Sequence, residues 1–332
     1  MKNNFIKISK ISLVLVYLVI LAGSLVRMTG SGMGCPDWPK CFDQYIPPTD
    51  ISQLPDNYQL YYSSKREKKI KKFTSFLTNI GLEEKAILIQ ADKSLLYEQP
   101  FNVWNTWLEY INRLIGALAG IFIFVGFLFA LFTKHQKVLR IFLGLGLILL
   151  TLFQAWWGSM VVATNIVPWV LTVHMVIAAL MILWQIIIIS IWSDSNKVIP
   201  RKLKVIAFVG LVFFLFQIVL GTQVRQIVDH WLDSNSRNEL IFQDFSLFLS
   251  HRTLALAIVV YSIILGSYAF FRKIKIIEIY FFAICVLSEA LVGKVLADFN
   301  LPALFQPIHL LLAMVSFGCL ARIVVNYKLD ET

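Results

Sequence analysis

Charged residues are scarce in this sequence of 332 residues. Asp, Glu, Lys and Arg make up 15% of the chain, whereas hydrophobic residues make up 58%. Soluble domains carry about 25% charged residues and about half apolar residues, so this composition excludes an ordinary soluble domain and indicates a chain that folds in lipid. The net charge is +10. Because no nucleic-acid-binding motif is present, we interpret this excess as a determinant of membrane topology.

Cysteine is also rare, with four residues, and the C-x-x-C-H motif that attaches haem covalently is absent. Cys285 and Cys319 lie within apolar runs, where cysteine is an ordinary small core residue. Cys35 and Cys41 differ because they flank the two prolines of GCPDWPKC in a hydrophilic segment. We interpret this pair as a disulfide, structural or redox-active, with two free thiols as the alternative.

Long apolar runs are what the sequence has in abundance. About 20 mostly apolar residues span a bilayer. The runs that reach this length are 11–28, 107–132, 138–162, 168–192, 203–225, 247–271, 276–297 and 303–325. The sequence therefore predicts an all-α integral membrane protein with eight transmembrane helices, and a long extracytoplasmic loop over 29–106.

Lys and Arg are distributed unequally between the two sides of these runs. The N-terminus and the loops after the second, fourth and sixth runs are basic, whereas loop 163–167 carries no charge and loop 226–246 is net acidic. Basic loops stay in the cytoplasm, so both termini are expected there. The basic run 65–72 is expected to be a solvated helical face, with a patch for anionic lipid or a partner as the alternative. No mitochondrial transit segment is apparent, so we expect a multi-pass protein of a bacterial cytoplasmic (inner) membrane.

The two halves of the chain resemble each other. The matched pairs are Gly158 with Gly293, Asn165 with Asn300, His174 with His309, Gly23 with Gly221, Arg27 with Arg225, Asn112 with His251, and Arg113 with Arg252. Four helices per half preserve the direction of each helix, so the repeat predicts two tandem pseudo-symmetric four-helix bundles. We expect 1–28 and 107–192 to form the N-terminal bundle and 193–332 to form the C-terminal bundle.

Three histidines, His174, His251 and His309, lie inside the predicted spans at positions that the repeat relates. Ionisable groups within membrane helices are costly, so three at symmetric positions indicate a functional site rather than core packing. A rise of about 1.5 Å per residue places His251 and His309 at one depth on facing helices. Two imidazoles there predict a bis-histidine haem site. Zinc is disfavoured because no cysteine or carboxylate completes a tetrahedral set at that level.

Haem also carries two propionates, which need cations. Arginine forks match carboxylates well, and four arginines lie on the outer side: Arg27, Arg113, Arg225 and Arg252. The alternative is that these arginines extend to the membrane interface without a ligand.

The two bundles are chemically unequal. Asn112 stands where the N-terminal bundle would have its second histidine, and Glu109 lies one turn before it on the same helical face. The C-terminal site is therefore expected to hold haem and pass electrons. The N-terminal site, with a looser axial position and a buried carboxylate, is expected to perform chemistry. The alternative for Glu109 is an interfacial helix-start residue stabilised by the helix dipole.

The strings LAGSLVRMTGSGMGCPDWPKC and EYINR, the HR pair of the sixth run, and the histidines of the fourth and eighth runs resemble haem A synthase. That family oxidises a ring methyl group of haem O to the formyl group of haem A, the cofactor of terminal oxidases. The resemblance covers all eight runs. It implies that His251 and His309 ligate a resident haem b, and that the N-terminal half binds haem O with His174 as an axial ligand. It further implies that Glu109 is the essential carboxylate.

The resemblance has consequences outside the haem ligands as well. The pair Cys35 and Cys41 matches the external cysteine pair of the family, whereas the second pair that bacterial members often carry in the loop after the fifth helix is absent. Asn112 departs from the histidine of the family, so haem O is expected to be held there by hydrogen bonding or by no bond. The implied partners are haem O synthase as substrate donor, a membrane electron acceptor and terminal oxidase assembly factors; a homo-oligomer stays open.

Two other functions fit the same features. One is a di-haem b-type membrane cytochrome that transfers electrons from quinol, and the other is a haem-binding assembly or transport protein without turnover. The asymmetry at Glu109 and Asn112 favours an oxidoreductase, because a pure electron carrier would use two coordinatively saturated haems.

Overall fold

The structure is a computed structural model that describes residues 2–132, 137–192, 198–232, 234–236, 239–242, 245–326 and 328–329. Its α-helices are α1 (Lys2–Met28), α2 (Tyr58–Asn79), α3 (Glu83–Ala91), α4 (Val103–Leu131), α5 (Lys137–Ala163), α6 (Pro168–Trp192), α7 (Arg201–Leu232), α8 (Ser246–Phe271), α9 (Ile277–Asp298) and α10 (Phe305–Asn326). The short 3-10 helices given for the described residues are η1 (Ser31–Met33), η2 (Ile51–Gln53) and η3 (Lys93–Leu96), and the strands β1 (Val198–Ile199) and β2 (Lys328–Leu329) pair in parallel.

Eight of the described helices, α1 and α4 to α10, are long and apolar enough to cross a membrane. The prediction of an eight-span integral membrane protein is therefore confirmed. Helix α4 begins at Val103, slightly before the expected run, and the hydrophilic segment between α1 and α4 is not a simple loop because it contains α2 and α3. The assignment of one half to a substrate haem and the other to haem b stays a prediction.

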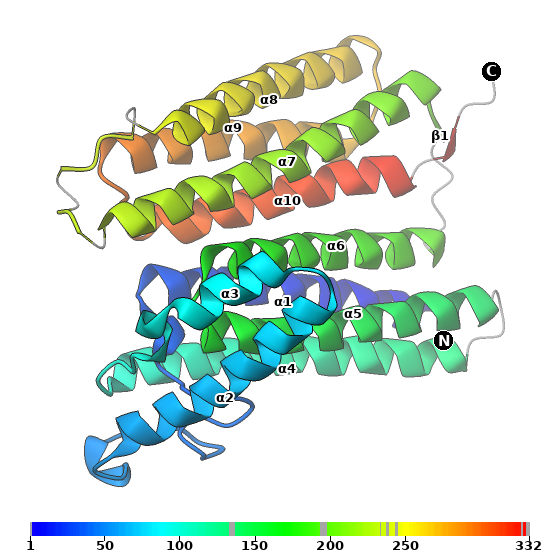
Figure 1. Ribbon diagram of the computed structural model, residues 1–332. Helices are drawn as coiled ribbons and strands as arrows, with labels where there is room; N and C mark the ends of the chain where they lie inside the picture. The colour runs from blue at the N-terminus through cyan, green and yellow to red at the C-terminus, as the bar shows by residue number, and fades with distance from the viewer. Residues whose placement is uncertain are drawn as a thin grey trace.

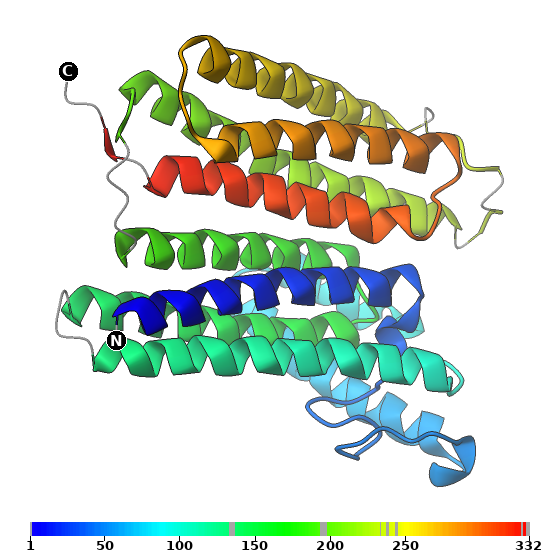
Figure 2. The same cartoon turned by 180° about the vertical axis from the view of Figure 1, so that it is seen from behind.

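The spanning helices pack in two groups of four, as Figures 1 and 2 show from opposite sides. Helices α1, α4, α5 and α6 contact one another in a ring, and α7, α8, α9 and α10 form a second ring. The two rings meet where α1 and α6 pack against α10 and where α6 packs against α7. The N-terminal end of α1 and the C-terminal end of α10 lie at the same end of the molecule (Figures 1 and 2).

The internal repeat extends to the backbone of the connecting turns. The turn from α5 to α6 has Asn165 and Ile166 at φ 50° and 61°, and the turn from α9 to α10 has Asn300 and Leu301 at φ 54° and 59°. In each turn the amide of the second residue donates to the carbonyl five positions earlier, at 2.8 and 2.9 Å. Asparagine tolerates this left-handed conformation better than most residues. The same turn therefore aims α6 and α10, which carry two of the three span histidines, in the same way.

Helices α2 and α3 lie against the first ring at the end away from the termini (Figure 1). The buried residues of α2 recur every three or four positions, as in an amphipathic helix: Tyr62, Arg66, Ile70, Phe73, Thr74 and Leu77. Phe73 stacks on Trp169 of α6 with 6.4 Å between ring centroids, and meets Trp157 of α5 edge to face at 5.7 Å. This aromatic cluster anchors α2 to the membrane-spanning helices.

The basic run of α2 is not entirely the solvated face that the sequence predicted. Arg66 is 1% exposed and its Nη2 lies 2.8 Å from Oε2 of Glu98, which is also buried. Burial raises the pKa of Glu98 to about 7, although the guanidinium of Arg66 acts in the opposite direction. Arg66 belongs to the packed face of α2 because its pairing with Glu98 offsets the desolvation of both groups.

Candidate functional site

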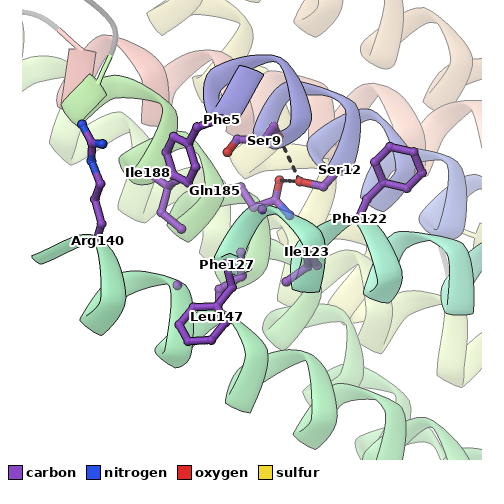
Figure 3. Close-up of a pocket in the computed structure, with 12 residues that line it drawn as sticks. Phe5, Ser9, Ser12, Phe122, Ile123, Phe127, Arg140, Leu147, Gln185 and Ile188 are labelled. Carbon is purple, nitrogen blue, oxygen red and sulfur yellow. Dashed lines mark hydrogen bonds between the residues drawn. The ribbon is translucent and has the colours of Figure 1, made fainter. Parts of the chain in front are cut away.

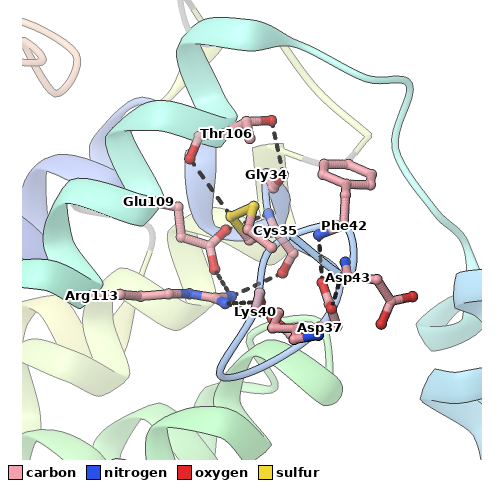
Figure 4. The surroundings of a disulfide bond; sticks show 10 residues. Gly34, Cys35, Asp37, Lys40, Phe42, Asp43, Thr106, Glu109 and Arg113 are labelled. Carbon is pink, nitrogen blue, oxygen red and sulfur yellow. Dashed lines mark hydrogen bonds and ion pairs between the residues drawn. A yellow bond between two sulfur atoms is a disulfide. The ribbon is translucent and has the colours of Figure 1, made fainter. Parts of the chain in front are cut away.

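Glu109 is a buried carboxylate near the start of α4, with 3% of its surface exposed. Its Oε2 accepts a hydrogen bond from the backbone amide of Cys35 at 2.9 Å, and its Oε1 accepts from Nη2 of Arg113 at 2.5 Å (Figure 4). A buried carboxylate is costly unless hydrogen bonds satisfy its oxygens. N–H donors face both oxygens here, so the structure holds this side chain in one orientation.

Arg113 clamps the loop that follows α1. Besides Glu109, it donates to the backbone carbonyls of Cys35 at 2.9 Å, Asp37 at 2.5 Å and Lys40 at 3.0 Å (Figure 4). These contacts occupy both terminal nitrogens of the guanidinium. The structure therefore places this arginine, which the sequence analysis grouped with the propionate ligands, in contact with the loop and with the carboxylate.

Cys35 and Cys41 form a disulfide, as the sequence predicted, and both are fully buried. Asp37 organises the loop between them, because its carboxylate accepts hydrogen bonds from the backbone amides of Phe42 at 2.7 Å and Asp43 at 2.9 Å. The disulfide and the aspartate together fix the conformation of the loop whose amide binds Glu109.

Gly34 permits this loop to approach α4 closely. A Cβ atom at this position would lie 2.5 Å from the backbone carbonyl of Asn105 and 2.7 Å from the amide nitrogen of Thr106. The carbonyl oxygen of Gly34 also accepts a hydrogen bond from Oγ1 of Thr106 at 2.9 Å. Only glycine leaves room for this contact, and the sequence analysis did not single it out.

Each of the three span histidines faces a glycine on the preceding helix. A Cβ atom on Gly158, Gly221 or Gly293 would lie 3.1, 3.2 or 3.2 Å from the Cε1 atom of His174, His251 or His309, respectively. The fourth helix pair follows the same plan, since Oδ1 of Asn112 is the nearest atom to a Cβ on Gly23, at 3.8 Å. That Oδ1 atom is buried without a hydrogen-bond partner. Each repeat-matched glycine therefore leaves room for the side chain of the residue that faces it.

A glutamine four residues before the glycine contacts the histidine in two of these pairs. Nε2 of Gln154 donates to the carbonyl oxygen of His174 at 3.0 Å, and Nε2 of Gln217 donates to that of His251 at the same distance. Each amide nitrogen also lies 3.3–3.4 Å from the Nε2 atom of the facing imidazole. The sequence analysis missed both glutamines, although their common spacing from the matched glycines was a signal.

The two histidine rings in the second group of helices lie at a separation that a shared metal ion allows. The ring centroids of His251 and His309 are 6.5 Å apart, and two imidazoles that share one metal, with bonds of about 2 Å, have centroids about 6 Å apart. Nδ1 of His309 lies 3.2 Å from the carbonyl oxygen of Glu289 and must donate there, which leaves Nε2 unprotonated for a metal. Among the residues that the structure describes, no group of three or more His, Cys, Asp or Glu is arranged to hold a metal ion.

Two of the predicted propionate ligands are joined by an acidic residue that the sequence analysis did not select. Asp229 of α7 accepts from Nη2 of Arg27 at 2.7 Å and pairs with Nε of Arg225 at 2.8 Å, so it links the C-terminal ends of α1 and α7. Nη1 of Arg225 also donates to Oε1 of Gln306 at 2.6 Å. Arg252 is exposed and makes no hydrogen bond or ion pair with the described part of the chain.

The fold and this arrangement define the class of protein. It is an eight-span integral membrane protein built from repeated helix pairs, and in each pair a histidine or an asparagine of one helix lies opposite a glycine of the other. Comparison with known families identifies the member more closely. The family described as cytochrome oxidase assembly protein, COX15-CtaA, matches residues 7–87 and 90–321. The chain belongs to this family, which confirms the resemblance found in its sequence motifs.

Curated relatives are similar to the chain at moderate identity. The heme A synthase of Shewanella oneidensis is 26% identical over 218 residues, which cover 64% of this chain and 54% of that protein. The heme A synthase of Caulobacter sp. strain K31 is 25% identical over 76% of this chain and 74% of its own length. That of Pelagibacter ubique is 24% identical over 92% of this chain and 93% of its own length. The match thus spans about half of the first relative and nearly all of the third.

Proposed function

We propose that this chain is a haem A synthase of the bacterial cytoplasmic membrane, an oxidoreductase that converts a ring methyl group of haem O to the formyl group of haem A. The observation that carries the proposal is the carboxylate of Glu109, held by Arg113 and the Cys35 amide one turn before Asn112. A di-haem cytochrome has no need of such a group beside an incomplete axial set. The family membership and the names of three relatives support the same activity.

The N-terminal bundle, residues 1–28 and 107–192, is proposed to bind haem O, with His174 as an axial ligand and Asn112 on the other side. Glu109 is fixed in orientation, so it can stabilise positive charge that develops at the oxidised methyl carbon or accept a proton released from it. Arg113 acts through Glu109 as a positioning residue, because it also binds the loop that supplies the second hydrogen bond.

The C-terminal bundle, residues 193–332, is proposed to hold haem b between His251 and His309. When bound, haem b supplies one-electron transfer. The bond from Nδ1 of His309 to the carbonyl oxygen of Glu289 leaves its Nε2 unprotonated for iron, and Gly221 and Gly293 leave room for both rings.

The propionate groups are proposed to bind the remaining arginines. Arg252 is available for a propionate of haem b, because it has no partner in the described part of the chain. Arg27 and Arg225 bind propionates by exchange with Asp229, whose carboxylate now occupies their donors. Both termini are proposed to face the cytoplasm. The end of the bundles that carries these arginines would then lie on the outer side. The proposed partners are a haem O synthase that supplies the substrate, a membrane electron acceptor and terminal oxidase assembly factors.

The decisive experiment is co-expression of the chain with an enzyme that makes haem O, followed by chromatography of the extracted haems. Haem A or its hydroxymethyl precursor is expected with the wild type. Neither is expected with Glu109→Gln, whose amide cannot supply the charge or accept the proton, while the haem b spectrum is unchanged. Haem b without any oxidised product in the wild type would reject the enzyme and favour the cytochrome.

A further inference from the structure

Arg140 is a buried cation at the opposite end of the first helix group from Glu109. It lies in the first turn of α5 with 1% of its surface exposed. Its guanidinium carbon is 4.8 Å from the ring centroid of Trp192 and 5.7 Å from that of Phe5. Nε and Nη1 have no hydrogen-bond partner within the described residues. Aromatic faces attract a cation, but they do not replace the hydrogen bonds that a buried guanidinium loses with water.

Two more donors at this end of the helices are also without a partner. Nε2 of Gln185 and Nε1 of Trp192 are both buried and make no hydrogen bond in the described part of the chain. The acceptor of Gln185 is already used, since Oγ of Ser12 lies 3.1 Å from its Oε1. All the unpartnered polar atoms here are therefore donors. The guanidinium of Arg140 is the charged donor among them, and a buried charged donor calls for an acceptor such as an anionic oxygen.

A cavity of about 20 Å³ is lined by Arg140 and Gln185 among other residues, whereas Trp192 does not line it. Arg140 stands at one end of it, Ser9, Ser12 and Gln185 stand at the other, and Phe5 lies between them (Figure 3). This volume holds about one water-sized group. A ligand can thus place a single acceptor atom in the cavity while the rest of the ligand stays outside.

We propose that this cavity receives one phosphate oxygen of an anionic phospholipid in the leaflet on the side of the chain termini. Arg140 lies three residues from the start of α5, or about 5 Å along the helix, which is the depth of lipid headgroups. The positive dipole at this helix N-terminus adds to the attraction for an anion. The outward faces of α4 and α5 carry exposed apolar side chains, such as Phe124 and Phe142, beside which acyl chains can lie.

Native mass spectrometry of the purified full-length protein tests the proposal. The delipidated protein is titrated separately with dioleoylphosphatidylglycerol, dioleoylphosphatidylcholine and inorganic phosphate. The wild type is expected to bind phosphatidylglycerol at least tenfold more tightly than phosphatidylcholine. Arg140→Gln should lose this preference. Arg201→Gln, the same change at an exposed arginine that begins α7, should retain it.

Further variants keep the test decisive if Arg140→Gln does not fold. Arg140→Lys keeps the charge but loses the fork, so it should weaken phosphatidylglycerol binding severalfold. Asp194, the acidic residue nearest to Trp192 in the sequence, lies outside the described residues, and Asp194→Asn should leave the preference unchanged.

Three results would overturn the proposal: no preference in the wild type, an undiminished preference in Arg140→Gln or Arg140→Lys, or a preference that appears only in Asp194→Asn. Displacement of the lipid by an equal concentration of inorganic phosphate would assign the site to a free anion instead. This proposal rests on the proposed function in one respect, the assignment of this leaflet as the cytoplasmic one. The lipid titration itself needs no turnover of haem. A failure here is therefore distinct from a failure of the enzyme assignment.

Discussion

Replacement of Gly34 by alanine tests whether the disulfide loop positions Glu109. The added Cβ would lie 2.5 Å from the backbone carbonyl of Asn105, and ordinary contact begins at about 3.4 Å. Both partners of this clash are backbone atoms, so no side chain can rotate to relieve it. The loop must therefore move away from α4 by about 0.9 Å, the difference between the two distances.

This displacement is enough to break the hydrogen bond that orients the carboxylate. A shift along the bond from the Cys35 amide to Glu109 would lengthen it from 2.9 Å to about 3.8 Å, which is too long for a hydrogen bond. Overpacking costs about 1–3 kcal/mol, and a misplacement of about 1 Å at a reacting group lowers rates by up to about 100-fold. We expect Gly34→Ala to reduce conversion of haem O by about 10-fold to 100-fold.

The assay is the yield of haem A per bound haem b after co-expression, measured by chromatography and absorbance. Gly266→Ala in α8 is the matched control, because its Cβ would lie in ordinary contact, 3.9 Å from Cβ of Ala283, in the other helix group. Equal yields from Gly34→Ala and Gly266→Ala, with the disulfide intact in both, would refute the positioning role of the loop.

Three other changes have defined outcomes. Burial raises the pKa of Glu98 from 4.5 to about 7, so the folded state keeps a proton that the unfolded chain releases between these values. Stability should fall as pH rises through this window, and Glu98→Gln should flatten the dependence in thermal unfolding. Gly293→Ala places a methyl group 3.2 Å from the ring of His309 and should weaken haem b binding by about 1 kcal/mol, seen as lower occupancy at limiting haem. His251→Ala should abolish the haem b spectrum while His174→Ala preserves it; equal loss in both would contradict the assignment of the two bundles.

The sequence predicts some contacts of the arginines and leaves others undetermined. Arg113 lies four residues after Glu109, so their contact on one helical face was readable from spacing alone. The three backbone partners of Arg113 in the disulfide loop could not be predicted from the sequence, because about 70 residues separate that loop from α4 along the chain. The contacts of Asp229 likewise depend on the tertiary structure, because they join Arg27 of α1 to α7, about 200 residues later in the chain.

The sequence by itself determined the number of spanning helices and the tandem repeat, and it predicted the depth of the three histidines. These follow from apolar run length, from self-similarity and from the constant rise of a helix, which are local or periodic properties. It also predicted the disulfide between Cys35 and Cys41, with two free thiols as the alternative, and the structure confirmed the bond. Only the tertiary structure decided which groups touch: the glycine behind each imidazole, the amide that holds Glu109, and the unpartnered guanidinium of Arg140. Contacts between helices depend on rotation and close approach, and composition and spacing do not specify either.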